Sequence, residues 1–256
     1  MKLIADYHTH TRYSHGKGTI EDNVRIAVRR GLKRIGIADH GFQHIGYGMS
    51  YKDIRNIRQE IDRLNKTYQG EIEILMCVEA NLIGLEGEID IPDEYLKVFD
   101  ILLVGFHKAV VPFRVKDGWE LFIKNALNAV VPFLGERIRE KNTSAFINAM
   151  ERYPIDIITH PGAKIDIDTR SLARQAARKK TVLEINAHHG YMTAEYVKIA
   201  MEEGAKFVIS SDAHHPSQVG SFEKGIRIAE EAGLSPKDII NAAENDGMEF
   251  PFKGDI

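Results

Sequence analysis

The chain has 256 residues, of which 43% are hydrophobic and 28% charged, and its formal net charge is −3. This length can bury a substantial core, and the charged fraction argues against a disordered chain. A slightly acidic protein is not expected to wrap duplex DNA by charge alone. The single cysteine cannot form an internal disulfide, and no apolar run reaches the roughly 18–20 residues of a membrane helix. The amino terminus turns polar after two apolar residues, so we expect a cytoplasmic protein without a signal peptide.

Seven short apolar runs recur along the chain and predict seven β-strands. They are rich in Ile, Val and Leu without strict alternation, which is typical of strands buried on both faces. The predicted strands are Leu3–Tyr7, Arg34–Ala38, Ile72–Val78, Ile101–Phe106, Asp156–Thr159, Val182–Asn186 and Phe207–Ser211.

Amphipathic stretches between these runs predict helices. Thr19 is a candidate cap for the first helix, and Asp53–Lys66 repeats Ile and Leu at spacings of three and four. Ser235 followed by Pro236 predicts the start of a last helix. The other predicted helices are Ile20–Arg30, Trp119–Leu134, Thr143–Arg152, Leu172–Lys179, Ala194–Glu203 and Phe222–Ala232, with loops or a small hairpin expected at 80–95 and 107–118.

Strand–helix repeats joined by short links favour parallel βαβ units. No linker or low-complexity segment divides the chain, so we predict a single domain over residues 1–256. With seven strands, a closed or distorted α/β barrel is favoured over an open doubly wound sheet, which remains the alternative.

The eleven histidines of the chain are concentrated just after the predicted strands. In an α/β barrel these positions share one face, where active sites form. His8 and His10 alternate along an extended segment, so both imidazoles point to one side and could hold one ion. Singly, each residue could be a hydrogen-bonded loop residue, a salt-bridge partner or a cap, but together they predict a metal site. The candidate ligands are His8, His10, His15, His40, Glu79, His107, His160, Asp212 and His214.

These residues stand in motifs that resemble the PHP (polymerase and histidinol phosphatase) family. The motifs are Asp6-Tyr7-His8-Thr9-His10, the later His15, Ala38-Asp39-His40, Val78-Glu79-Ala80, Gly105-Phe106-His107, Thr159-His160-Pro161-Gly162 and Ser210-Ser211-Asp212-Ala213-His214. The resemblance covers nearly the whole chain. It is nearest to the single-domain YcdX-type phosphatases, through Glu79-Ala80-Asn81 and Gly87-Glu88-Ile89-Asp90. It implies a distorted (β/α)7 barrel, in agreement with the seven repeats counted above.

The resemblance also implies a site for three divalent metal ions, with zinc, manganese or iron as the metals that family members use. By resemblance, the first ion would be held by His8, His10, Glu79 and Asp212, the second by Glu79, His107 and His160, and the third by His15, His40 and His214. The implied enzyme is a metal-dependent phosphatase. It would hydrolyse a small phosphomonoester by attack of a metal-bridging hydroxide, without a covalent enzyme intermediate.

The sequence leaves the proton donor and the substrate contacts open. Asp39, His188 and His189 are candidates for the general acid, although Asp39 could instead orient an imidazole. Lys17 and Lys164 are candidates for contact with the substrate phosphate, and the alternative for both is solvated surface charge. Lys108, Arg114, Arg137 and Arg139 could also border the metal face, and His44 and His215 have no assigned role.

Other functions were weighed against this one. A nuclease or phosphodiesterase acting on nucleic-acid ends is one alternative, because PHP domains also occur beside DNA polymerases; no basic stripe with interleaved aromatics supports it. A histidinol-phosphate phosphatase is another, and a non-catalytic scaffold is disfavoured by the complete ligand set. Asp166–Thr169 matches the nucleophile motif of haloacid-dehalogenase phosphatases, but it follows a loop, so Asp168 or Thr169 is expected to cap a helix. Cys77 has apolar neighbours and is expected to be a buried thiol.

Overall fold

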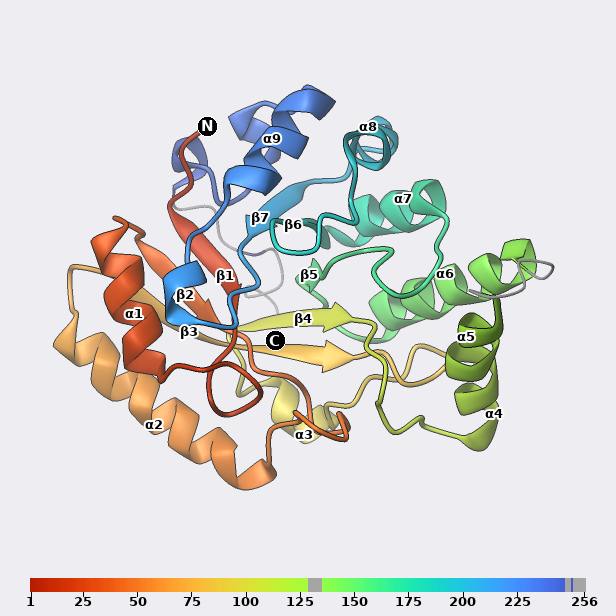
Figure 1. Cartoon of the computed structure of the whole chain (residues 1–256), viewed down its shortest axis with the longest axis horizontal. Helices are drawn as coiled ribbons and strands as arrows, with labels where there is room; N and C mark the ends of the chain where they lie inside the picture. The colour runs from red at the N-terminus through yellow and green to blue at the C-terminus, as the bar shows by residue number, and fades with distance from the viewer. Residues whose placement is uncertain (129–134, 247–249, 251–256) are drawn as a thin grey trace.

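A computed structural model describes residues 1–128, 135–246 and 250 of the chain. Seven strands, hydrogen-bonded in chain order and all parallel, curve into a nearly closed barrel with helices around it (Figure 1). This confirms the predicted α/β barrel of seven strands, a (β/α)7 barrel. The strands are β1 Ala5–Thr9, β2 Arg34–Ile37, β3 Glu73–Asn81, β4 Ile101–Gly105, β5 Ile157–Ile158, β6 Val182–Asn186 and β7 Phe207–Ser210.

The barrel closes between β1 and β7 with little strand pairing. A single parallel bridge joins Thr9 to Ala213. Nearer the other end, the Asn241 side chain lies between the strands, where its Nδ2 donates to the carbonyls of Ala5 at 2.7 Å and Ile209 at 2.8 Å. The prediction of a helix after Ser235 is wrong. Only one helical turn forms, at Pro236–Asp238, and the chain then extends to pair with the barrel.

The predicted helices follow the predicted order, but two short helices, Asp93–Leu96 and Val115–Asp117, were not predicted and lie largely in the stretches expected as loops. Two further differences lie around residues 118–142. A π-helical segment, Gly118–Ile123, separates α4 from α5, and the end of the helix predicted at Trp119–Leu134 lies outside the described residues. The helix predicted from Thr143 already begins at Gly135, because the charged residues before Thr143 are strong helix formers and Ile138 is buried. The helices are α1 Ile20–Arg29, α2 Tyr51–Thr67, α3 Asp93–Leu96, α4 Val115–Asp117, α5 Lys124–Asn128, α6 Gly135–Arg152, α7 Thr169–Lys179, α8 Ala194–Glu202 and α9 Glu223–Ala232.

Two local predictions are confirmed by side-chain contacts. Asp168 caps α7, since its carboxylate accepts a hydrogen bond from the Arg170 backbone N–H at 3.1 Å. Cys77 is buried, as expected. In the described part of the chain, no helix combines the length and the apolar character needed to cross a membrane.

Alternate residues of each strand point into the barrel, and this phase sets the position of the site. Leu75 and Cys77 of β3 pack inside against Val182 of β6 and other strand residues in one apolar cluster. Continuing each strand in the same phase brings Glu79 and Glu184 into the interior near the carboxyl ends of the strands. The barrel is therefore apolar towards the amino ends of its strands and polar at the opposite mouth.

Candidate metal centre

The nine candidate ligands converge at the carboxyl-terminal mouth of the barrel. Seven of them are buried, whereas His15 and His214 are half-buried at the entrance. Two carry a left-handed backbone, His160 with φ 29° and Asp212 with φ 52°. Such strain in residues other than glycine costs about 1–3 kcal/mol and is concentrated at functional sites. The fold thus holds these side chains at the mouth against a local backbone cost.

Glu79 lies at the middle of the cluster. Its Oε1 is 2.9 Å from His160 Nε2 and 3.5 Å from His107 Nε2, and it accepts a hydrogen bond from Thr159 Oγ1 at 2.8 Å. Its Oε2 is 3.0 Å from His40 Nδ1 and 3.3 Å from His8 Nε2. The two oxygens therefore face imidazoles from different strands, which is the arrangement of a carboxylate that could bridge two ions.

Asp212 forms a second focus with the two histidines of β1 and its end. Its Oδ1 is 3.2 Å from His10 Nε2 and 3.6 Å from His8 Nε2, and these two nitrogens are 3.1 Å apart. The ligand atoms of all three residues lie within 4.8 Å of one another. Two imidazole nitrogens and a carboxylate oxygen directed at one point can hold a single divalent ion.

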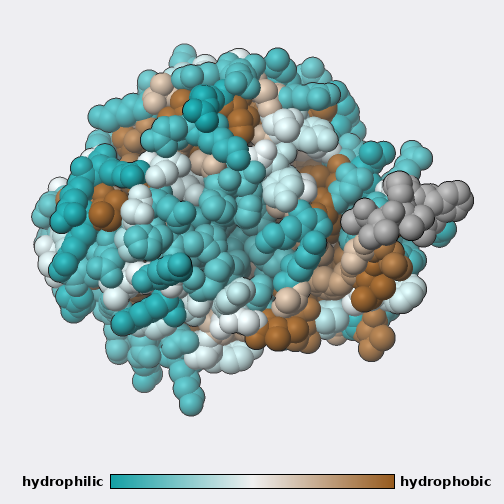
Figure 2. Space-filling view, in the orientation of Figure 1, coloured by the Kyte–Doolittle hydropathy of each residue, from teal (hydrophilic) through white to brown (hydrophobic). Residues whose placement is uncertain are grey.

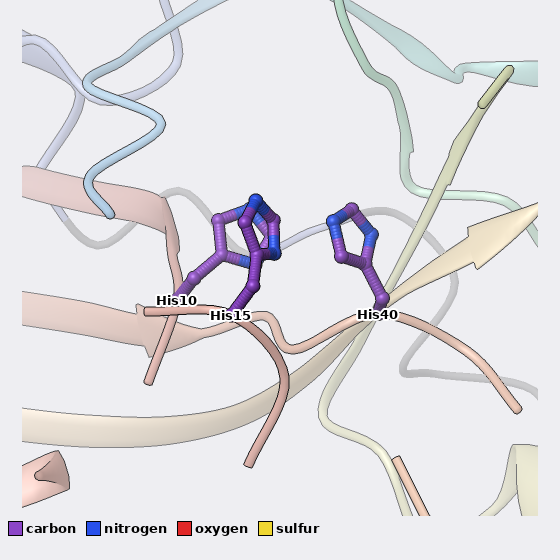
Figure 3. A group of neighbouring side chains, drawn as sticks. All are labelled: His10, His15 and His40. Carbon is purple, nitrogen blue, oxygen red and sulfur yellow. The ribbon is translucent and has the colours of Figure 1, made fainter. Parts of the chain in front are cut away.

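The third focus is made of imidazoles. The rings of His10, His15 and His40 turn towards one another from the segments that follow β1 and β2 (Figure 3). The ring centroids of His15 and His40 are 4.9 Å apart, and those of His15 and His214 are 4.1 Å apart. Ligand atoms of His10, His15 and His40 lie within 4.8 Å of one another, as do those of His40, Glu79 and His107. His10 and His40 thus each belong to two of these groups of neighbouring ligand atoms.

Several buried polar atoms of the cluster have no hydrogen-bond partner. They are Nδ1 of His10, His15, His40 and His160, and Oε2 of Glu79. Burying such atoms without a partner is costly, and native structures contain few of them. A divalent ion would satisfy Glu79 Oε2 and His40 Nδ1, which face each other at 3.0 Å. A set of imidazole nitrogens with two carboxylates suits zinc, iron or manganese. The residues present therefore fit the metals that the sequence motifs imply.

The carboxylates of the cluster favour a positive charge among them, which in the absence of an ion is the proton of His8. Burial by itself lowers the pKa of His8, but the carboxylates of Glu79, Glu184 and Asp212 outweigh it and raise that pKa well above the usual value. Burial lowers the pKa of His10 well below its usual value. The Glu79 pKa is well below its usual range, because the neighbouring imidazoles, with His107 the strongest, outweigh burial. Glu79 is thus ionised, and His10 offers a neutral imidazole.

Glu184 is a site residue that the sequence reasoning missed. It is fully buried, and its Oε1 lies 2.8 Å from His8 Nδ1. Its Oε2 accepts hydrogen bonds from the His160 backbone N–H at 2.7 Å and from Asn186 Nδ2 at 3.0 Å. The signal was present in β6, where a glutamate lies in phase with Val182 inside an otherwise apolar strand. Glu184 orients His8 and leaves its Nε2 directed into the cluster.

A polar relay orients His107 in a similar way. Its Nδ1 lies 2.7 Å from Asn81 Oδ1, and Asn81 Nδ2 donates to Asp90 Oδ2 at 2.6 Å. Asp90 also accepts from the Asn81 backbone N–H at 2.7 Å. This relay links two of the motif segments noted in the sequence, and it leaves His107 Nε2 facing Glu79.

The three candidates for the general acid occupy different places. Both carboxylate oxygens of Asp39 accept hydrogen bonds from the loop that carries His15, from the backbone N–H and hydroxyl of Thr11 and from Ser14. Asp39 therefore holds this loop in place. His189 is half-buried, with Nε2 3.4 Å from Asp212 Oδ2, whereas His188 is exposed at the rim.

The remaining candidates divide between the rim and the outer surface. Lys17 and Lys164 are exposed, and the Lys17 backbone N–H donates to the His214 carbonyl at 2.8 Å. Burial, followed by the charges of His40 and Lys164, lowers the pKa of His44 to about 4, which places the Lys164 ammonium near this rim. His215 is exposed and caps the turn at Pro216–Gln218, so it does not belong to the cluster.

Proteins that are similar to this chain in sequence or in fold carry phosphatase names. Two curated relatives are each named "Probable phosphatase". The one from Shewanella sediminis is 30% identical over 99% of this chain and 95% of the relative. The one from Caldanaerobacter subterraneus subsp. tengcongensis is 31% identical over 95% of this chain and 89% of the relative. The fold is similar to that of the hisK protein of Listeria monocytogenes, with a TM-score of 0.64, 18% identity and coverage of 84% of this chain and 97% of that one. It is also similar to histidinol phosphate phosphatase from Lactococcus lactis subsp. lactis, solved with zinc, L-histidinol and phosphate, with a TM-score of 0.61, 15% identity and coverage of 91% and 95%. Residues 6–231 match the PHP domain, and the chain therefore belongs to the PHP domain family.

Proposed function

We propose that the chain hydrolyses a small phosphomonoester at a site for three divalent metal ions formed by the nine convergent residues. It is a phosphatase of the hydrolase class, as its family and its curated relatives indicate. The proposal concerns the number of ions and the substrate class. The observation that carries it is the position of Glu79, whose two oxygens face imidazoles of four different strands or strand ends while Oε2 lacks a hydrogen bond.

The residues would divide among the ions as the sequence motifs imply. His8, His10 and Asp212 would hold the first ion and His107 and His160 the second, with Glu79 between the two. His15, His214 and His40 would hold the third, at the entrance. When bound, the ions supply Lewis acidity, which lowers the pKa of a water molecule and stabilises charge on the phosphoryl oxygens.

The chain's own residues complete the site. Glu184 and Asn81 orient His8 and His107 through their Nδ1 atoms. Lys164 and Lys17, both exposed near the rim, would attract the anionic substrate. His189 is nearer to the cluster than His188, since it lies half-buried beside Asp212, but burial lowers its pKa to about 4, so it would carry no acidic proton at neutral pH. Asp39 keeps the His15 loop in place.

Monoesters are favoured over the phosphodiesters of nucleic acid because most of the cluster is buried inside the mouth of the barrel. Histidinol phosphate stays one candidate monoester, since the Lactococcus lactis protein of similar fold was solved with L-histidinol and phosphate. A phosphodiesterase or exonuclease acting on nucleic-acid ends is the alternative that the test below separates. The cytoplasmic location expected from the cysteine content stays a prediction.

The test is a hydrolysis screen of the metal-loaded protein against phosphomonoesters and phosphodiesters. We expect turnover of monoesters that His107→Ala lowers at least 100-fold, because Glu79 Oε1 would lose one of the imidazoles that share its ion. Hydrolysis of diesters alone would contradict the proposed substrate class. Full activity in His107→Ala would contradict the proposed site.

A further inference from the structure

An apolar groove lies on the segment that follows β4, beside the group of nine candidate metal ligands, hereafter the metal cluster. It has a volume of about 530 Å³ and is lined by Val110, Pro112, Val115, Trp119, Phe122 and Ile123, among others. Figure 2 shows hydrophobic side chains gathered over the region that Figure 1 labels α4 and α5. Val115 is 92% exposed and Trp119 is 53% exposed, which is unusual for large apolar side chains in one patch.

The groove is continuous with the rim of the metal cluster. Val110, which lines the groove, forms an antiparallel bridge with His44. The His44 ring lies 5.3 Å from the His40 ring and 6.2 Å from the His107 ring. A residue opposite another in an antiparallel pair lies about 5 Å away. One residue pair therefore separates the wall of the groove from the imidazoles of the cluster.

The backbone at this junction is held firmly in place. The Ile45 backbone N–H donates to the Ala109 carbonyl at 2.9 Å, and the Val111 N–H donates to the Gln43 carbonyl at 3.0 Å. Ala109 has a left-handed backbone with φ 61°, and it turns the chain from His107 into the groove. The 530 Å³ volume is within the range of sites for small organic ligands.

We propose that this groove binds the apolar part of the substrate's alcohol, so that the substrate class is a phosphomonoester with an extended alkyl or aryl group. The inference rests on the proposed function, because the metal cluster must take the phosphate. Loaded with divalent ions, the cluster would be cationic, and a cationic site next to an apolar groove is complementary to an amphipathic molecule with an anionic head. The exposed Ile45, whose backbone N–H donates to the Ala109 carbonyl, and the exposed Tyr47, whose ring centroid is 5.0 Å from that of His44, would extend the apolar contact at the rim.

The test compares ethyl phosphate with n-hexyl phosphate, whose leaving alcohols have similar acidity but differ by four methylene groups. We expect kcat/KM to be about tenfold higher for the hexyl ester, which corresponds to burying about two of those methylenes. Trp119→Ala and Val115→Asp should each bring the ratio of the two kcat/KM values close to one. Val115→Asp guards against misfolding, because this side chain is almost fully exposed. Tyr196→Ala, which removes another exposed aromatic ring from α8, is the matched control and should keep the tenfold ratio.

A binding measurement separates this inference from the proposed function. Trp119 is the only tryptophan of the chain, so its fluorescence reports directly on the groove. n-Hexylphosphonate, which cannot be hydrolysed, should shift the Trp119 emission of the metal-loaded protein, and ethylphosphonate should not. Equal kcat/KM values with no shift would overturn the groove assignment and leave the phosphatase proposal intact. A shift of the Trp119 emission by n-hexylphosphonate, without hydrolysis of any monoester, would support the groove assignment and overturn the proposed function. A shift of the emission with protein concentration alone would instead indicate contact between copies of the chain.

Discussion

Replacing Glu184 by glutamine tests whether this buried carboxylate organises the metal cluster. Its two oxygens receive three contacts, from His8 Nδ1 at 2.8 Å, the His160 backbone N–H at 2.7 Å and Asn186 Nδ2 at 3.0 Å. A glutamine has almost the same shape but only one acceptor oxygen. If that oxygen keeps His8, the new amide N–H2 group faces two other donors.

The expected cost follows from these contacts. Each buried donor left without an acceptor costs about 1–3 kcal/mol, so two of them lower the free energy of unfolding by about 2–6 kcal/mol. Loss of the carboxylate also weakens the orientation and basicity of His8. Partners of this kind are worth about 10–100-fold in metal affinity.

The assay has two readouts, chemical denaturation and the metal retained during titration with a chelator. The matched control is Glu203→Gln, which removes a surface carboxylate paired with Arg170 and Arg174 and should leave both stability and metal retention close to the wild-type values. Glu184→Gln with the metal retention and stability of the wild type would refute the reasoning.

The remaining predictions concern packing, barrel closure and metal removal. In Gly105→Ala, the added Cβ would lie 2.3 Å from Thr159 Oγ1 and 3.1 Å from Glu79 Oε1. We expect the free energy of unfolding, measured by denaturation, to fall by about 1–3 kcal/mol and the metal content to fall measurably. An unchanged metal content would show that Glu79 is not positioned by this contact. Asn241→Ala removes the side chain that links β1 to β7 and should cost about 2–4 kcal/mol in unfolding free energy, while the metal content per folded chain stays at the wild-type value. Removing bound ions should lower the melting temperature and adding zinc or manganese should restore it, with about 2.7 kcal/mol regained at an ion concentration 100 times Kd. Identical melting curves with and without ions would contradict a buried metal centre.

Most of the candidate site could be predicted because a barrel simplifies the geometry. Strand ends that are far apart in the sequence, such as those before His40 and Asp212, must meet at one mouth once the strands are parallel and closed. The residue types at those ends then indicated a metal site. This convergence does not depend on loop conformation, so the residues meet at the mouth even though β1 runs from Ala5 to Thr9, two residues later than predicted.

The parts that were missed have separate physical reasons. Asn241 is distant in sequence from both strands that it links, and its hydrogen bonds outweigh the helix signal at Ser235 and Pro236. Glu184 could have been found from its phase within β6, but its role requires His8 and His160 to be within reach. The helix boundary at Gly135 was missed because a charged, mostly exposed stretch carries little apolar periodicity.

The most direct test of the central claim is the metal content of the purified protein, measured by plasma mass spectrometry against protein concentration. The account predicts three divalent ions per chain in the active wild-type protein. In Glu79→Gln it predicts the loss of the two ions that share this carboxylate, together with the loss of hydrolysis. An active protein with one ion or none per chain, or a Glu79→Gln variant that keeps three ions, would contradict it.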